Sequence, residues 1–200
     1  TINGGTLTSK QAVVQNWNKA QILGGNLTGG YLWTDSYTEA GTVGETVIGG
    51  DAQFTGTIYM DVTSPNPSTL KIEGGKLDVT KWRVTDAAAA ADATIAVSGG
   101  TFTNEVPADY CAAGYAPAAN ADGTYGVKQA VTVTFDSNEG TAVDSQLVPV
   151  GDKVAKPADP TKEGYTFSGW FTDEDCTNAY DFDAPVAVSY THLTLPTNSR

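Results

Sequence analysis

Carboxylates are the side chains of this 200-residue sequence that could do chemistry. Hydrolysis of a glycosidic bond needs two of them at a fixed separation, one with a raised pKa. The acidic residues between the expected strands of the first half form no such pair and fall at ordinary turn positions: Asp51, Asp61, Asp78 and Asp92. This half also lacks a His-Gly element and an Arg-x-Lys element for lyase chemistry. We therefore predict that the chain is not an enzyme and has no catalytic residue.

The sequence also offers little support for a metal or cofactor site. Three adjacent residues are acidic: Asp173, Glu174 and Asp175. Such a run could bind calcium weakly. The alternative is a solvated loop, because adjacent side chains point in different directions and do not surround one ion. Cys111 and Cys176 have no metal-ligand spacing, and we expect both to be unpaired, with Cys111 a small buried apolar residue. The Gly pairs lack the Lys and the helix of a phosphate-binding loop. We predict no metal and no cofactor.

The stretch "EGYTFSGWFTDEDCTNAYDF", residues 163–182, is rich in aromatic side chains. It holds Tyr165, Phe167, Trp170, Phe171, Tyr180 and Phe182. These rings either grip a ligand or form a core. A module of about 60 residues has little core, so a few large rings must supply most of it. We predict that Trp170 and Phe167 are core residues, and that Tyr165 or Phe171 is exposed and able to touch a partner.

Composition narrows the class of protein. The chain has 22 Gly and 9 Pro, which favour strands and turns over long helices. Its formal net charge is −12, spread along its length, and no basic patch exists to neutralise phosphates. No apolar run approaches the ~18 residues that a membrane helix needs. We exclude nucleic acid and membrane insertion as interactions of this chain.

Gly-Gly pairs recur through the first half with steps of 20, 25, 25 and 25 residues. The pairs are Gly4-Gly5, Gly24-Gly25, Gly49-Gly50, Gly74-Gly75 and Gly99-Gly100, and Gly29-Gly30 falls outside the series. Each pair has an apolar residue two positions before it and another two positions after it. Short strands follow at 31–33, 57–60 and 81–84. Repeats of this length stack, which predicts a parallel β-helix, or solenoid, of ~25-residue coils. Leucine-rich repeats share the period, but their asparagine ladder and Leu spacing are absent.

The constant phase about the Gly pairs predicts two ladders inside the solenoid. The first comprises Ile22, Val47, Ile72 and Val97, and the second Leu27, Ala52, Leu77 and Phe102. Glycine would let the chain turn a corner between them. The alanine-rich segment 86–97 is either a loop or a short helical insert between coils.

The segment 99–127, "GGTFTNEVPADYCAAGYAPAANADGTYGV", differs from the coils before it. It resembles the closing unit of many Gly-Gly repeat proteins on bacterial surfaces. Its prolines and glycines would stop further stacking, and the Asp-Gly near its end predicts a hairpin. We assign residues 1–127 to the solenoid and about 101–127 to a cap over its last edge.

Residues 130–187 resemble the Listeria–Bacteroides repeat, also called the internalin B-repeat. The resemblance rests on "VTFDSNEG" at 133–140, "VPVGDKVAKPADPTKEGYTFSGWFTD" at 148–173 and "AYDFDAPV" at 179–186. It implies a small β-grasp-like α+β module of secreted or cell-surface proteins, used as a spacer or for adhesion. Glu139 stands where that family usually has Gly, and the family's last strand is missing.

The tail, residues 188–200, reads "VSYTHLTLPTNSR". Its composition differs from that of the acidic sequence before it, and it holds the single histidine, His192. Its first ten residues resemble a translated sequencing adapter. We therefore predict a non-native tail, a truncated module with an unpaired edge, and a gene fragment of metagenomic origin. The alternative is that "SYTHLTL" pairs as a makeshift strand.

Taken together, these features predict a mainly β fragment of a secreted or cell-wall bacterial protein. Its expected role is that of a non-catalytic stalk and adhesion module, whose partner is a host or microbial surface protein or a glycan. The alternative is the carbohydrate-binding or polysaccharide-degrading portion of a larger β-helix protein, with its catalytic coils elsewhere.

Overall fold

The computed structural model describes residues 1–36, 43–61, 66–90, 92–187 and 192–194. Its contacts divide the chain into two compact units, Thr1–Lys128 and Gln129–Arg200. The division falls inside strand β8 (Tyr125–Asp136). The two units are described separately below.

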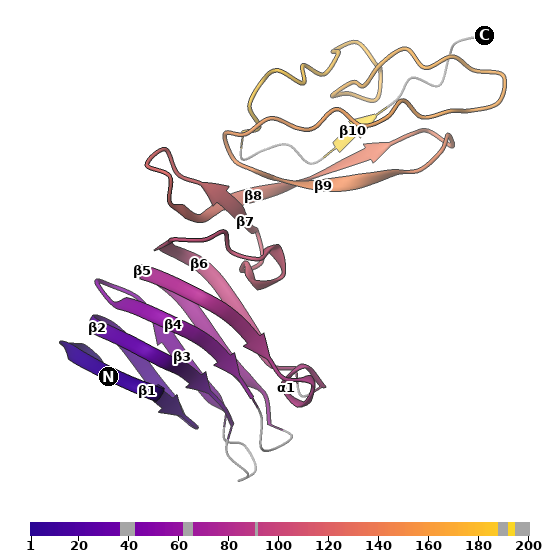
Figure 1. The fold of residues 1–200 in the computed structure, drawn as a ribbon. Coiled ribbons are helices and arrows are strands. Elements are labelled where there is room, and N and C mark those ends of the chain that lie inside the picture. The colour runs from indigo at the N-terminus through magenta and orange to yellow at the C-terminus, as the bar shows by residue number, and fades with distance from the viewer. Residues whose placement is uncertain (37–42, 62–65, 91, 188–191, 195–200) are drawn as a thin grey trace. The chain divides into compact units, whose positions relative to one another are not determined.

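Unit 1 is a β-solenoid of about four turns, as the repeat predicts. Its strands are β1 (Ile2–Asn16), β2 (Lys19–Thr34), β3 (Gly44–Ile48), β4 (Gln53–Met60), β5 (Ser68–Val84) and β6 (Thr94–Phe102). Each strand pairs in parallel with the equivalent strand of the next coil: β1 with β2, β2 with β3 and β4, these two with β5, and β5 with β6. Figure 1 shows these strands stacked side by side.

The first ladder runs through the centre of the solenoid, with one correction. Ile22 pairs with Ile48, Ile48 with Ile72, and Ile72 with Val97, and all four are at most 1% exposed. Val47, the predicted member, is only half-buried and pairs with Lys71, an outward position. Burial of the four stacked side chains gives unit 1 its core.

The second ladder needs a similar correction. Leu27 pairs with Phe54, Phe54 with Leu77, and Leu77 with Phe102. Ala52 is buried but lies in a turn between β3 and β4, where its amide donates to the Gly49 carbonyl. The errors arise because the Gly pair sits differently in this coil: Gly49 follows Ile48 directly, whereas one residue separates Ile22 from Gly24. After the pair, three residues precede Phe54, whereas one precedes Leu27, so the whole corner is one residue longer.

Glycine makes the corners. The second glycine of each of the five pairs has a φ between 53° and 101°, a region that strains other residues. The extra pair, Gly29-Gly30, belongs to a second corner with Gly56 one coil on, where the register shifts. A Cβ at Gly30 would lie 1.8 Å from the Gln11 carbonyl oxygen, and one at Gly56 2.2 Å from that of Gly29. Main chain therefore packs directly on main chain at this corner.

Gly30→Ala is expected to lower the free energy of unfolding of unit 1 by about 1–3 kcal/mol, because a backbone atom must move to admit the methyl group. Gly4→Ala is the matched control, since nothing lies within 4 Å of its added Cβ and its φ is not positive. Urea unfolding followed by circular dichroism measures both. Equal midpoints for the two variants would contradict the close approach.

The alanine-rich segment contains a short helical insert, α1 (Asp86–Ala90), followed by β6. Thr85 caps it, because its hydroxyl accepts from the amide of Ala88 and its carbonyl from that of Ala89. Beyond β6, a 3₁₀ turn η1 (Ala108–Tyr110) and β7 (Tyr115–Ala119) follow. A tight turn at 120–124, with Gly123 at φ 83°, joins β7 to β8 at the predicted hairpin.

The segment after β6 also covers the last coil. Cys111 forms a parallel bridge with Val97, and Phe102 pairs with Tyr125. The Tyr110 ring lies 5.2 Å from that of Trp82, and Val106 is buried. Cys111 is half-buried, and this burial raises the pKa of its thiol. Both cysteines are free thiols and lie in different units.

Unit 2 is built on the antiparallel hairpin of β8 and β9 (Val143–Pro149), with β10 (His192–Thr194) parallel to β8. Its core comprises Val133, Phe135, Val148, Val154, Trp170 and Val186. Residues 165–170 form no strand, and Phe171 forms only an isolated bridge with Ala179. No helix lies in the part of unit 2 that the structure describes. The β-grasp-like arrangement stays a prediction.

Glu139 lies at the tip of this hairpin region with φ 66°, which explains why glycine would suit its position. Glu139→Gly is expected to stabilise unit 2 by about 0.5–1 kcal/mol, because the strain of the left-handed backbone is relieved. The ion pair that it loses, 3.1 Å to Lys162, involves a carboxylate 86% exposed and contributes little.

Asn138→Gly is the matched control. Asn138 has φ 47°, but asparagine tolerates this region better, so a smaller gain is expected. Thermal melts of both variants measure the difference. A Glu139→Gly variant that melts below the parent chain would rule out the strain argument.

Part of the tail is ordered as a strand. His192–Thr194 pairs with Thr134–Asp136, so the expected unpaired edge is wrong for these three residues of β8. Residues 188–191 and 195–200 lie outside the described part of the chain. The adapter origin of the tail stays a prediction.

Deletion of residues 188–200 is expected to lower the melting midpoint of unit 2 by several degrees, since it removes a partner of β8; about 1 kcal/mol corresponds to 4–8 °C in a domain of this size. A scrambled tail of equal length is the control. An unchanged midpoint on deletion would show that β10 adds nothing to stability.

Candidate binding surfaces

The carboxylates that could have done chemistry in the solenoid have ordinary structural surroundings. Asp61 accepts from the hydroxyls of Thr85 (2.7 Å) and Tyr59 (3.0 Å), and Asp78 from Thr103 (2.6 Å). Asp51 is exposed in the turn after Gly50, and Asp92 has φ 55° after α1. The bonds from Thr85 and Thr103 connect neighbouring coils, the bond from Tyr59 lies within one coil, and none of them builds an acid–base pair.

The acidic loop of unit 2 uses one of its three carboxylates internally. Asp173 accepts from the amides of Thr177 (2.7 Å) and Asn178 (2.9 Å) and from the Thr177 hydroxyl. The bond from the Thr177 amide is the main cause that holds the pKa of Asp173 below its usual range. No group of three His, Cys, Asp or Glu side chains is placed to hold a metal within the residues that the structure describes. The carboxylate of Asp173 therefore stabilises the loop 173–178 by accepting hydrogen bonds from its amides.

The aromatic cluster of unit 2 is mainly core. Trp170 is 2% exposed, and its ring lies 5.0 Å from Phe135 and 5.8 Å from Phe167 in edge-to-face arrangements. Phe167 is partly buried against this core, whereas Tyr165 is 46% exposed beneath the Lys162 ammonium group. Trp170 is confirmed as a core residue, and Tyr165 is the ring that remains accessible.

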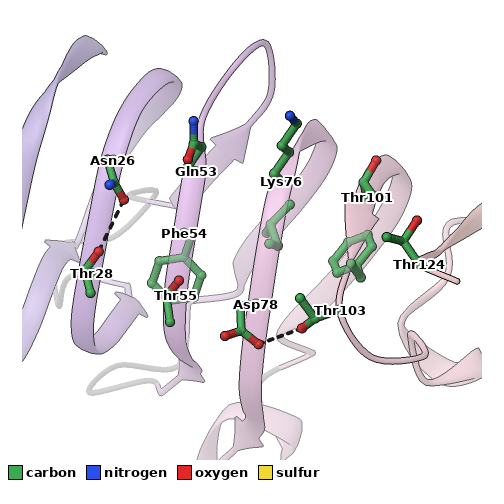
Figure 2. A pocket seen from close by; sticks show the side chains of 12 residues that line it. Asn26, Thr28, Gln53, Phe54, Thr55, Lys76, Asp78, Thr101, Thr103 and Thr124 are labelled. Carbon is green, nitrogen blue, oxygen red and sulfur yellow. Dashed lines mark hydrogen bonds between the residues drawn. The ribbon is translucent and has the colours of Figure 1, made fainter. Parts of the chain in front are cut away.

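A polar hollow lies on the solenoid (Figure 2). Its volume is about 390 Å³. One row of side chains crosses four strands through Asn26, Gln53, Lys76 and Thr101, and a second row comprises Thr28, Thr55, Asp78 and Thr103. The ring of Phe54 lies between the rows and Thr124 lies at one end, while Leu77 and Phe102 also line the hollow.

The hollow offers hydroxyl, amide, ammonium and carboxylate groups at a regular spacing. Lys76 is exposed and Asp78 half-buried, two positions apart on β5, so a cation and a carboxylate face the same recess. Thr28 donates to Asn26 within its own coil, and Thr103 donates to Asp78 across coils. Such a set can hydrogen-bond several hydroxyls of a bound molecule.

Sequence reasoning named none of these side chains as binding residues. The polar residue after each Gly pair was the available signal, and it marks Asn26, Lys76 and Thr101 correctly. It gives Asp51 for the third coil, where the longer corner places Gln53 instead.

Residues 132–195 match the sequence model of the Listeria-Bacteroides repeat domain. This confirms the resemblance of residues 130–187 and extends beyond their end. Two curated proteins of Evansella cellulosilytica are similar to part of the chain: a "Putative Gly-rich membrane protein", 43% identical over 51 residues, and a "Putative membrane protein", 42% identical over 52 residues. Each match covers 26% of this chain, and only 6% and 8% of those proteins.

No solved structure matches the chain. Among the described residues, no helix has the length and apolar character that crossing a bilayer requires.

Proposed function

We propose that the chain is part of a bacterial cell-surface protein, in which the solenoid is a non-catalytic stalk that binds a glycan and unit 2 is a spacer or adhesion module. The Listeria-Bacteroides repeat match and the membrane-protein names of the two relatives support a surface location. The location that this implies is extracellular, either attached to the cell wall or secreted.

The polar hollow is the observation that carries the binding role. Its floor is apolar, its two walls are rows of hydrogen-bonding side chains, and its volume of about 390 Å³ suits a sugar unit. The carboxylate in it, Asp78, accepts a hydrogen bond from Thr103, and among the described residues no second carboxylate lines the hollow to complete a hydrolytic pair. The arrangement supports binding rather than bond cleavage.

A panel of immobilised neutral and charged glycans tests this role with the 200-residue chain. Binding to at least one glycan is expected, and it should weaken by about tenfold in Lys76→Ala and Asp78→Ala, which remove groups from the wall. Lys128→Ala is the control, because Lys128 does not line the hollow. Binding that is absent, or equal in all variants, would contradict the proposal.

A second candidate is the glycan-binding portion of a longer polysaccharide-degrading protein, which the same hollow favours. Release of reducing ends from each bound polysaccharide separates the two. The stalk proposal expects none from this chain, and measurable release would show that it is itself an enzyme.

A further inference from the structure

A second face of the solenoid concentrates aromatic and cationic side chains. After the Gly29-Gly30 and Gly56 corner, Leu32 and Ile58 point inward and are fully buried. The residues on either side of them therefore point outward. We define the aromatic–cationic face as Tyr31, Trp33, Tyr59, Lys81 and Arg83.

Register places these side chains in two rows across three successive coils. Trp33 pairs with Tyr59, and Tyr59 with Arg83, while Thr57 stands between Tyr31 and Lys81 in the other row. The Tyr59 ring lies 5.2 Å from Trp33 and 5.6 Å from Tyr31, and the Arg83 guanidinium lies 4.8 Å from it.

Among the residues that the structure describes, the two cations of this face have no carboxylate partner. Lys81 and Arg83 are both exposed, and neither forms an ion pair with any residue that the structure describes. The nearby Asp61 already accepts from Tyr59 and Thr85, and Trp17 donates to the buried Asp35. On a chain of net charge −12, two unpaired cations side by side are a local exception.

We propose that the aromatic–cationic face binds an acidic polysaccharide, a polymer of uronic acid units. The C–H face of a pyranose ring stacks on Tyr31, and the sugar carboxylates bind Lys81 and Arg83. Charge-assisted hydrogen bonds from guanidinium to carboxylate are among the strongest available at a surface. Acidic residues elsewhere on the chain repel the polymer weakly, because salt screens charges beyond about 8–10 Å.

This site is separate from the polar hollow, with which it shares no residue. A purely structural role for the rings would make the face indifferent to ligand charge. Binding is therefore tested with oligogalacturonate, with its methyl ester, which keeps the sugar rings but removes the charge, and with polyglutamate, which keeps the charge but lacks the rings.

Calorimetry with the whole chain is expected to show binding of oligogalacturonate. The affinity should fall about tenfold for the methyl ester, and about tenfold in the double variant Arg83→Gln, Lys81→Gln. Added salt should also lower the affinity. Arg83→Lys, which keeps the charge, should retain part of the affinity, and Tyr31→Ala should weaken oligogalacturonate binding. Lys76→Gln, in the polar hollow, should leave it unchanged, so failure of this site and of the proposed function are distinguishable.

Circular dichroism confirms that each variant is folded before its affinity is compared. Equal binding of the ester, or of polyglutamate, would overturn the proposal. Loss of oligogalacturonate binding in Lys76→Gln but not in the Arg83 variants would move the site to the hollow and overturn it equally.

Discussion

Ile72→Asp is expected to lower the free energy of unfolding of unit 1 by about 5 kcal/mol. Ile72 is fully buried between Ile48 and Val97, in the middle of the first ladder. The substitution removes about 2–5 kcal/mol of packing and buries a carboxylate without a partner. That loss is comparable to the whole stability of a small domain, so unit 1 should be largely unfolded at moderate temperature.

Thr80→Asp is the matched control, because Thr80 lies on the same strand with an exposed side chain. A change within about 0.5 kcal/mol is expected there. Urea titration followed by far-ultraviolet circular dichroism and by proteolysis measures both variants. An Ile72→Asp chain with the midpoint of the parent would show that the ladder is not the core of unit 1.

Trp170→Ala is expected to destabilise unit 2 by about 3–5 kcal/mol, close to all that so small a core supplies. The indole ring packs edge-to-face on both Phe135 and Phe167, so its removal leaves a cavity in the centre of the cluster. Thermal melting with probes of both units should show unit 2 unfolding early while the transition of unit 1 keeps its midpoint.

Trp170→Phe separates ring packing from hydrogen bonding. The indole nitrogen of Trp170 is buried and has no hydrogen-bond partner among the residues that the structure describes. Replacing the indole by a phenyl ring removes that donor and keeps most of the contact, so a cost below about 1.5 kcal/mol is expected. Equal losses for Trp170→Ala and Trp170→Phe would mean that the ring does not carry the core.

The Gly pairs were sufficient to predict the solenoid, because each second glycine has the positive φ that a corner needs. They were not sufficient to fix the ladder in the third coil. Counting from glycines assumes that every pair stands at the same distance from its ladder residues, whereas Gly49 directly follows Ile48, so the count gave Val47 instead.

Trp170 could be predicted as core from its size alone, since no other side chain near it buries as much area. Residues 165–170 alternate in apolar character but form no strand, and Gly164 and Gly169, near the two ends of this segment, have φ values of 78° and 143°. Alternation of apolar and polar residues does not reveal where the backbone takes a positive φ.

The binding surfaces could not be predicted because they depend on register between coils. Tyr31 and Tyr59 are 28 positions apart in the sequence, and the corner at Gly56 decides that their rings meet. The short strands at 31–33, 57–60 and 81–84 were visible in the sequence, but not the alignment that places Arg83 beside Tyr59.

The two kinds of corner have different consequences for how such a solenoid can change in evolution. At residues 49–52 an extra residue is absorbed in a turn, and pairing resumes at Gln53. At Gly29, Gly30 and Gly56 the main chains touch, and an added side chain has no room. Insertions and deletions should therefore accumulate at the first kind of corner, while the second kind keeps its length and its glycines. New rows of outward-facing binding side chains should then arise by substitution on the strands between the corners.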